Sequence, residues 1–136
     1  MNIDKAKTHL RKVDPTMAKL ISKYGSPNFE PIKNHFESLA RSIIYQQLSG
    51  KAANAIYERF KNLFGNNDFP YPENILVLPA EVLQKVGLSK QKIIYLKDLS
   101  IKWEQIKIQF SNIEKMSNGE ISNILLEVKG IGQWTI

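Results

Sequence analysis

Apolar residues recur at helical spacing in several parts of the chain. The first clear set lies three, four and seven residues apart and predicts a helix with one buried face from about Asn34 to Gln46. Its members are Phe36, Leu39, Ala40, Ile43 and Ile44. A second helix is predicted from Ser49, a good N-cap residue, to Gly65. Its apolar stripe comprises Ala52, Ala53, Ile56, Tyr57, Phe60, Leu63 and Phe64. The polar segment 46–48 is therefore an inter-helix turn.

Two shorter helices are predicted ahead of this pair. Asp4 can cap a helix that ends near Lys12. The Asp14-Pro15 pair begins another helix, which Gly25 ends, because proline is favoured at the first helical position and glycine just past the last. Proline-containing loops are predicted at 26–31 and 65–72, since the residue before a proline avoids the helical conformation.

The second half of the chain continues the helical pattern. Pro72 and Pro79 predict the first positions of two short helices that end near Val77 and at Gly87. Ser89 caps a longer helix that ends before residue 111. Its less regular apolar stripe comprises Ile93, Leu96, Leu99, Ile101 and Trp103.

The last predicted helix begins at a capping box. Ser117 is followed three residues later by Glu120, and the helix ends at Gly130. No window has the sustained period-two alternation of a strand; 106–110 alternates only briefly. The pattern predicts an all-α protein.

Composition narrows the class of protein. The chain has 136 residues, 43% of them hydrophobic, which predicts one small domain spanning 1–136. With no cysteine, disulfide frameworks, thiolate zinc sites and cysteine catalysis are excluded. The two histidines, His9 and His35, are not spaced as metal ligands, so we expect no metal site.

The N-terminus and the charge balance bear on location and partner. The start of the chain is charged and has no apolar stretch behind it, and no apolar run is long enough to span a membrane. We expect an intracellular protein, cytoplasmic (nucleoid-associated) or nuclear and not secreted. Residues 1–68 carry 11 basic and 6 acidic side chains, against 8 and 7 in 69–136. This surplus fits a nucleic-acid partner, and a lysine-rich solvated surface is the alternative.

The segment after the last predicted helix has the pattern of a tight hairpin. Gly130 and Gly132 flank Ile131, so the backbone can adopt angles closed to other residues while the isoleucine enters the core. A second helix beginning there would leave free N–H groups that bind a phosphate, with Lys129 beside them. An ordinary helix C-cap followed by a turn is the alternative interpretation.

Several segments together resemble one protein family. Residues 129–135, KGIGQWT, resemble the hairpin of the helix-hairpin-helix (HhH-GPD) DNA glycosylase superfamily. The Trp-Thr pair resembles its alkylpurine branch, the DNA-3-methyladenine glycosylase II branch, and so does 36–53, FESLARSIIYQQLSGKAA. Gly87-Leu88-Ser89 with Lys92 and Leu96, and Asp14-Pro15, also match. The resemblance implies an all-α helix-hairpin-helix fold over essentially the whole chain, with the hairpin at 118–136.

The resemblance also implies a function. It is that of a monofunctional N-glycosylase in base excision repair, without a cofactor or catalytic metal. Such an enzyme flips an alkylated purine out of double-stranded DNA and hydrolyses its N-glycosidic bond, and we expect it to act as a monomer. By the family pattern Gln47 is the wedge that fills the gap left by the base. The expected DNA-binding residues are Gln47, Leu48, Ser49, Lys129, Gly130, Ile131 and Gly132.

Aromatic residues are the candidates for the base pocket. An alkylated purine carries positive charge, which an electron-rich ring attracts. Trp134 matches an aromatic residue near the family's pocket, and Tyr45 is a second candidate. The structural alternative for Trp134 is core packing against Ile131.

The chain departs from the family pattern at its end. The family's general base is an Asp about twenty residues after the hairpin, whereas this sequence stops at Ile136 with no acidic residue beyond Glu127. No catalytic residue is assigned, because Asp98 and Asp68 do not match the motif. The second hairpin helix would have only 133–136, a single turn that cannot hold a helix alone. We expect an N-terminal portion of a glycosylase, incomplete at the C-terminus, inactive alone and less stable than the longer protein.

Two other functions fit parts of the sequence. A non-enzymatic helix-hairpin-helix DNA-binding module has no need of a catalytic Asp, nor of a wedge at Gln47. A helical protein-interaction domain predicts affinity that does not depend on salt, whereas binding to DNA weakens steeply as salt rises.

Overall fold

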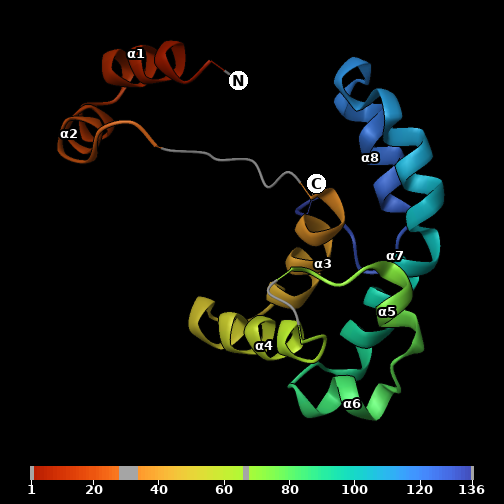
Figure 1. The fold of residues 1–136 in the computed structure, drawn as a ribbon. Helices are drawn as coiled ribbons and strands as arrows, with labels where there is room; N and C mark the ends of the chain where they lie inside the picture. Colours follow the sequence, from red (N-terminus) through yellow and green to blue (C-terminus); the bar gives the residue numbers. More distant parts are fainter. Residues whose placement is uncertain (1, 28–33, 66–67, 136) are drawn as a thin grey trace. The chain divides into compact units, whose positions relative to one another are not determined.

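The computed structural model describes residues 2–27, 34–65 and 68–135 (Figure 1). Over these ranges the chain forms eight α-helices and one 3-10 helix and contains no strand, which confirms the all-α prediction. The chain divides into two compact units, Met1–Pro31 and Ile32–Ile136, and each is described by itself. No helix within the described ranges combines the length and the apolar character that crossing a bilayer requires.

The first unit is a pair of short helices, α1 (Ile3–Val13) and α2 (Pro15–Tyr24). The predicted cap at Asp4 is wrong: Asn2 has the extended backbone of an N-cap, and its side chain accepts a hydrogen bond from the backbone N–H of Lys5. Asp4 lies in the first turn, where its charge suits the helix dipole. Asp14 caps α2 and Gly25 ends it, as predicted.

The second unit contains the remaining helices. They are α3 (His35–Tyr45), α4 (Gly50–Asn62), α5 (Pro72–Val77), α6 (Ala80–Lys85), α7 (Lys90–Gln109), the 3-10 helix η1 (Phe110–Lys115) and α8 (Asn118–Leu126). The predicted caps Ser49, Ser89 and Ser117 all accept a hydrogen bond from the first turn of their helix, and Asn34, near which a helix was predicted to begin, caps α3 in the same way. Pro79 is the N-cap of α6 rather than its first residue.

Several helices end earlier than the glycines predict. After α4, the N–H of Leu63 donates to Phe60 and that of Phe64 to Lys61, so a tighter turn fills the space before Gly65. In the same way, tight turns separate the end of α8 at Leu126 from Gly130. The predicted loops at 26–31 and 65–72 lie partly outside the described residues.

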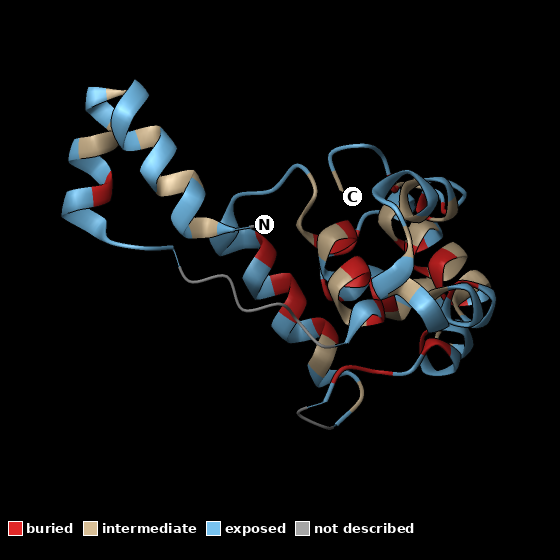
Figure 2. Ribbon diagram, turned by 90° about the horizontal axis from the view of Figure 1, so that it is seen from above, coloured by how far each residue is buried: buried red, intermediate tan, exposed pale blue. Residues whose placement is uncertain are grey.

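The core lies in the second unit (Figure 2). All five apolar residues predicted for α3 are buried, and α7 places Ile93, Leu96 and Leu99 against them. The predicted core positions Ala52, Leu63 and Ile101 are exposed instead. In the first unit Ile21 is the one buried residue among 2–27. The second unit therefore has the packed interior that can hold a site rigidly.

Candidate functional site

Two connections between helices contact each other in the second unit. The first is the α3–α4 turn, residues 46–49, and the second is the hairpin, residues 127–135. Nε2 of Gln46 donates to the backbone oxygen of Gly130 at 2.7 Å and approaches Oγ1 of Thr135 at 3.5 Å. Segments about 85 residues apart in sequence thus meet at one place.

The α3–α4 turn contains an unusual backbone conformation. Gln47 has φ of 57°, and it is the one non-glycine residue with positive φ in the described part of the chain. This left-handed conformation costs a residue with a Cβ atom about 1–2 kcal/mol. The N–H of Leu48 donates to Tyr45 at 3.3 Å, and the Ser49 hydroxyl caps α4. Gln47, Leu48 and Ser49 are all exposed.

A lysine of α7 holds the end of α3 next to this turn. Nζ of Lys92 donates to the backbone oxygen of Ile44 at 2.6 Å. Burial lowers the pKa of Lys92, since the surrounding protein disfavours its charged form. The bond satisfies a carbonyl that the helix end leaves without an internal partner.

The hairpin requires glycine at one of its two glycine positions. Gly130 has φ of 83°, and a Cβ atom there would lie 2.1 Å from Cδ2 of Tyr95. Ile131 is only 5% exposed and packs in the core, as predicted. Gly132 has neither a positive φ nor an atom within 4 Å of its Cβ position, so the expectation that both glycines are needed for the backbone is wrong for Gly132. Its Cβ position faces open space.

Two charged residues of α7, Asp98 and Lys102, hold the start of the hairpin by hydrogen bonds, and we call this pair the clip. Oδ2 of Asp98 accepts from the backbone N–H of Lys129 and from Nζ of Lys102, both at 2.8 Å. The same Nζ donates to the backbone oxygen of Glu127 at 2.5 Å. Burial acts to raise the pKa of Asp98, but the bonds from Lys102 and Lys129 outweigh it and hold the pKa below its ordinary value. The clip fixes the hairpin backbone and leaves the Lys129 side chain exposed.

The last described residues form a turn, as expected for a second hairpin helix of only a single turn. The N–H of Thr135 donates to Gly132 at 2.8 Å, and residues 133–135 stay in turn conformation because a single turn does not sustain a helix. Within the described ranges, the N–H groups of Gly132, Gln133 and Trp134 have no protein acceptor. These three exposed residues offer donors to an anion.

The two predicted base-pocket residues differ in their surroundings. Trp134 is fully exposed, so the alternative of core packing against Ile131 is wrong. Tyr45 is half-buried, and its hydroxyl donates to Oδ1 of Asn54 at 3.1 Å. The Arg41 guanidinium carbon lies 4.8 Å from the Tyr45 ring centroid, so a cation already occupies this ring.

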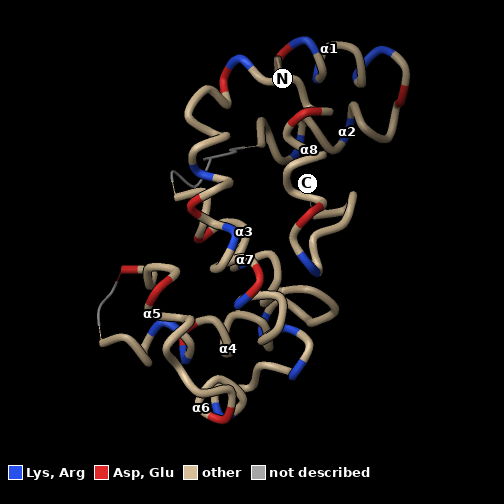
Figure 3. Tube along the Cα trace, turned by 90° about the vertical axis from the view of Figure 1, so that its right-hand side faces the viewer, with Lys and Arg blue, Asp and Glu red and all other residues tan. Residues whose placement is uncertain are grey.

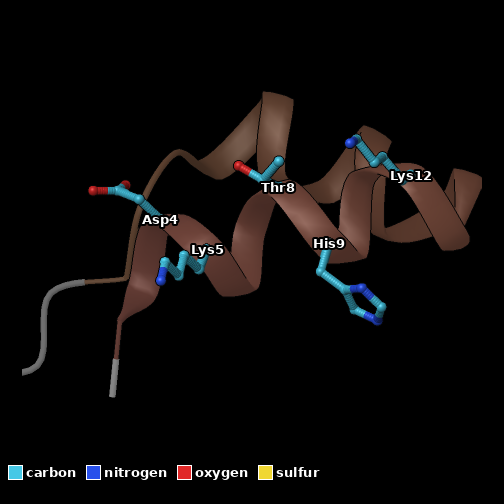
Figure 4. A pocket seen from close by; sticks show the side chains of 5 residues that line it. All are labelled: Asp4, Lys5, Thr8, His9 and Lys12. Atoms are coloured by element: carbon cyan, nitrogen blue, oxygen red, sulfur yellow. The ribbon is translucent and has the colours of Figure 1, made fainter.

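Two hollows of the surface lie away from the predicted site residues. One of about 930 Å³ has Phe36, Phe69 and Trp103 among its lining residues. Another, of about 400 Å³, lies on the first unit, and Figure 4 shows its five lining side chains, all on α1. Neither is lined by a residue of the α3–α4 turn or the hairpin. Within the described ranges no three His, Asp or Glu residues gather as metal ligands would.

The sequence interpretation missed the residues that support the site. Gln46, Lys92, Tyr95, Asp98 and Lys102 received no role, yet each contacts the α3–α4 turn, the hairpin or the end of α3. The last four recur every three or four residues on α7, which places them near one face of the helix. This polar stripe is the signal that could have found them.

Comparisons with known proteins agree on a family. Residues 40–129 match the family model described as HhH-GPD superfamily base excision DNA repair protein. DNA-3-methyladenine glycosylase 1 of Schizosaccharomyces pombe is 36% identical over an alignment that covers 99% of this chain. That alignment covers 61% of the relative, so the chain spans about three fifths of its length.

Solved structures have the same fold. The 3-methyladenine DNA glycosylase of Schizosaccharomyces pombe, solved in complex with abasic DNA, superposes with a TM-score of 0.80 and 35% identity over 96% of this chain and 66% of that one. A DNA-3-methyladenine glycosidase from Bacillus halodurans gives a TM-score of 0.77 and 33% identity over 98% of this chain and 61% of that one.

Proposed function

The chain belongs to the HhH-GPD superfamily of base excision DNA repair proteins, and we propose that it binds damaged duplex DNA as part of an alkylpurine DNA glycosylase. The observation that carries this proposal is the contact of the α3–α4 turn with the hairpin through Gln46. It puts an exposed, strained polar residue and a set of free backbone donors on neighbouring segments. A base-flipping protein needs both features together.

The hairpin is the proposed phosphate anchor. Backbone N–H groups bind a phosphate without regard to base sequence, and a positive side chain nearby strengthens the contact. Gly132, Gln133 and Trp134 supply donors, Lys129 supplies charge, and the open space beside Gly132 allows a close approach. Gly130 and Ile131 hold the loop from inside.

The α3–α4 turn is the proposed wedge. When a base leaves the stack, a side chain must fill the gap. Gln47 projects from a backbone held between Gln46 and the Ser49 cap, with Leu48 exposed beside it. Strained, exposed positions of this kind are typical of functional sites.

Trp134 is the proposed aromatic partner of the alkylated base. Its ring is fully exposed, whereas the Tyr45 ring is already paired with Arg41, so we rank Trp134 above Tyr45. An N3- or N7-alkylated purine is cationic and is attracted to an electron-rich ring. In the whole protein the flipped base would then lose its N-glycosidic bond by hydrolysis. The protein would act as a monomer wherever the DNA is held, in the cytoplasm or the nucleus.

The charges of the second unit are mixed, which favours DNA contact at a few defined places over contact through a uniformly basic face. Figure 3 shows Lys and Arg interspersed with Asp and Glu along its helices. Much of the basic surplus lies in the first unit, where residues 2–27 have six basic and two acidic side chains. Specific contacts at the turn and hairpin therefore have to supply the preference for damaged DNA.

Binding to abasic-site and intact duplexes tests the proposal. We expect the wild-type chain to prefer abasic-site DNA, and binding to both duplexes to weaken steeply as salt rises. Gln47→Ala should reduce the preference about tenfold, because unstacking a base without a wedge costs on the order of a kcal/mol or more. Its affinity for the intact duplex should not change. Fluorescence anisotropy at several salt concentrations measures both quantities.

Gln105→Ala is the matched control, since Gln105 is an exposed glutamine of α7. It should behave as wild type with both duplexes. Affinity independent of salt would contradict DNA binding and favour a protein-interaction domain. A wild-type chain that binds both duplexes equally, with no effect of Gln47→Ala, would favour a DNA-binding module that does not flip bases.

A further inference from the structure

The α3–α4 turn and the hairpin are joined by a single glutamine side chain, and we propose that Gln46 is a positioning residue that holds them in fixed register. This inference rests on the proposed function, in which the turn supplies the wedge and the hairpin the phosphate anchor. Gln46 does not fill the gap in the DNA itself. It fixes where Gln47 stands relative to the hairpin amides.

The contact between Gln46 and Gly130 has the geometry of a strong hydrogen bond. The Gln46 amide lies 2.7 Å from the Gly130 oxygen and is half-buried, so water competes with the bond only in part. A Cβ atom at Gly130 would lie 2.1 Å from the Tyr95 ring, so the accepting carbonyl belongs to a backbone segment that lies directly against this side chain. The same Nε2 lies 3.5 Å from Oγ1 of Thr135, at the far end of the hairpin. One side chain thereby reaches both ends of the loop that carries the free N–H groups.

The hydrogen bond of Gln46 affects the next residue, Gln47, because the two are adjacent in the chain. Gln47 follows directly and has the left-handed backbone. A strained residue stays in place only when its surroundings fix it on both sides. The Ser49 cap supplies one side and the Gln46 bond the other. Without Gln46, the turn could relax and move the Gln47 side chain away from the hairpin.

The other anchors do not perform this task. Lys92 bonds the end of α3, and Asp98 with Lys102 bonds the start of the hairpin, but none of the three joins the turn to the hairpin. In the described part of the chain, Gln46 is the one side chain of the turn with a hydrogen bond to the hairpin. The register between wedge and anchor depends on it.

Gln46→Met tests the tie without DNA, because methionine keeps the length and neutrality of glutamine but cannot donate. The backbone amides of Leu48 and Thr135 report on the turn and the hairpin. We expect both to exchange hydrogen about tenfold faster, the order expected from losing one hydrogen bond. The buried amides of Leu96 and Leu99 should be unaffected. Exchange measured by NMR gives all four, with Gln105→Met as the control.

The same variants test the role toward DNA through a double-mutant comparison. Gln46→Met should lower the preference for abasic-site over intact duplex by about tenfold, with little change in affinity for the intact duplex. If Gln46 acts by placing Gln47, the Gln46→Met/Gln47→Ala double variant should lose no more preference than Gln47→Ala alone. A residue that only stabilised the fold would weaken binding to both duplexes and add its effect to that of Gln47→Ala.

The outcomes separate this inference from the proposed function. Exchange and preference both unchanged in Gln46→Met would overturn the inference while leaving the proposed function intact. Additive losses in the double variant would also overturn it. A wild-type chain without preference for abasic-site DNA would overturn the proposed function, and hydrogen exchange would still decide whether Gln46 ties the two segments.

Discussion

The α3–α4 turn and the hairpin solve the same problem of chain reversal in different ways. Both contain a left-handed residue, Gly130 in the hairpin and Gln47 in the turn. Glycine adopts this conformation at little cost, whereas glutamine does not. The hairpin is thus built from the residue its backbone needs, and the turn has a residue its backbone disfavours. The difference indicates that the Gln47 side chain is there for a reason other than the fold.

The two segments also differ in how their neighbours hold them. The hairpin is held through its backbone by Asp98 and Lys102 of α7, while the side chains of Lys129, Gln133 and Trp134 remain exposed. The turn is held through the side chain of its first residue, Gln46. Substitution of Gly130 or of the residues that hold the hairpin backbone should therefore act chiefly on stability, and substitution in the turn chiefly on binding.

The largest effect is expected at Gly130, where the fold depends on glycine. Gly130→Ala places a methyl group against the Tyr95 ring and forces a left-handed alanine. We expect the free energy of unfolding to fall by about 1–3 kcal/mol from crowding and by about a further 1–2 kcal/mol from the backbone. Urea denaturation followed by circular dichroism measures the loss.

Gly132→Ala is the matched comparison within the same hairpin. Its methyl group meets open space and its φ is not positive, so the free energy of unfolding should change by no more than about 1 kcal/mol. Affinity for duplex DNA should nevertheless fall, because the methyl group stands where a phosphate would approach. Equal losses of stability in the two variants would contradict the assignment of Gly130 as the one required glycine.

The next effect in size is expected from the clip on the hairpin. Asp98→Asn keeps an acceptor for the Lys129 amide but loses the charge, and should cost about 1.5 kcal/mol at pH 7. The pKa of Asp98 is lower in the folded protein than in the unfolded chain. Its contribution is therefore complete above the ordinary aspartate pKa of about 4 and is lost as pH falls through the lower folded value.

Urea unfolding of wild type and Asp98→Asn at pH 7 and at pH 3 tests this sign. The difference in stability between the two proteins should shrink at the lower pH. Glu104→Gln is the control, since Glu104 makes only an exposed pair with Lys107 and should show no such difference. A difference in stability between the two proteins that increases toward pH 3 would mean that the charge of Asp98 does not stabilise the hairpin.

The sequence predicted those features of the fold that depend on neighbours along the chain. Ser49, Ser89 and Ser117 begin helices because a side-chain oxygen reaches an N–H three residues on, and this pattern is visible in the residues themselves. The hairpin was predicted from neighbouring residues as well, from Gly130 and Gly132 on either side of Ile131. Local chemistry decides such features almost alone.

The contacts that assemble the site could not be predicted in this way. Gln46 and Gly130 are separated by 84 residues, and Asp98 and Lys129 by 31. Such pairs meet only through the packing of segments that are far apart in the sequence; α7, for example, carries Asp98 and packs against α3. The strain at Gln47 was also invisible, because a glutamine does not favour positive φ and its residue type gives no sign of one.

The smallest effect on stability is expected at Gln47. It is also the effect that best distinguishes the turn from the hairpin. Gln47→Gly removes the strain that Gln47→Ala retains, so the glycine variant should be more stable by about 0.5–1 kcal/mol after the greater flexibility of unfolded glycine is counted. Both variants lack the wedge, so both should lose preference for abasic-site DNA. Urea denaturation and anisotropy on the same preparations measure the two effects. A glycine variant less stable than the alanine variant would show that the turn is not strained. The expected result, a fold that gains stability while binding is lost, would separate Gln47 from Gly130, whose replacement should weaken the fold itself.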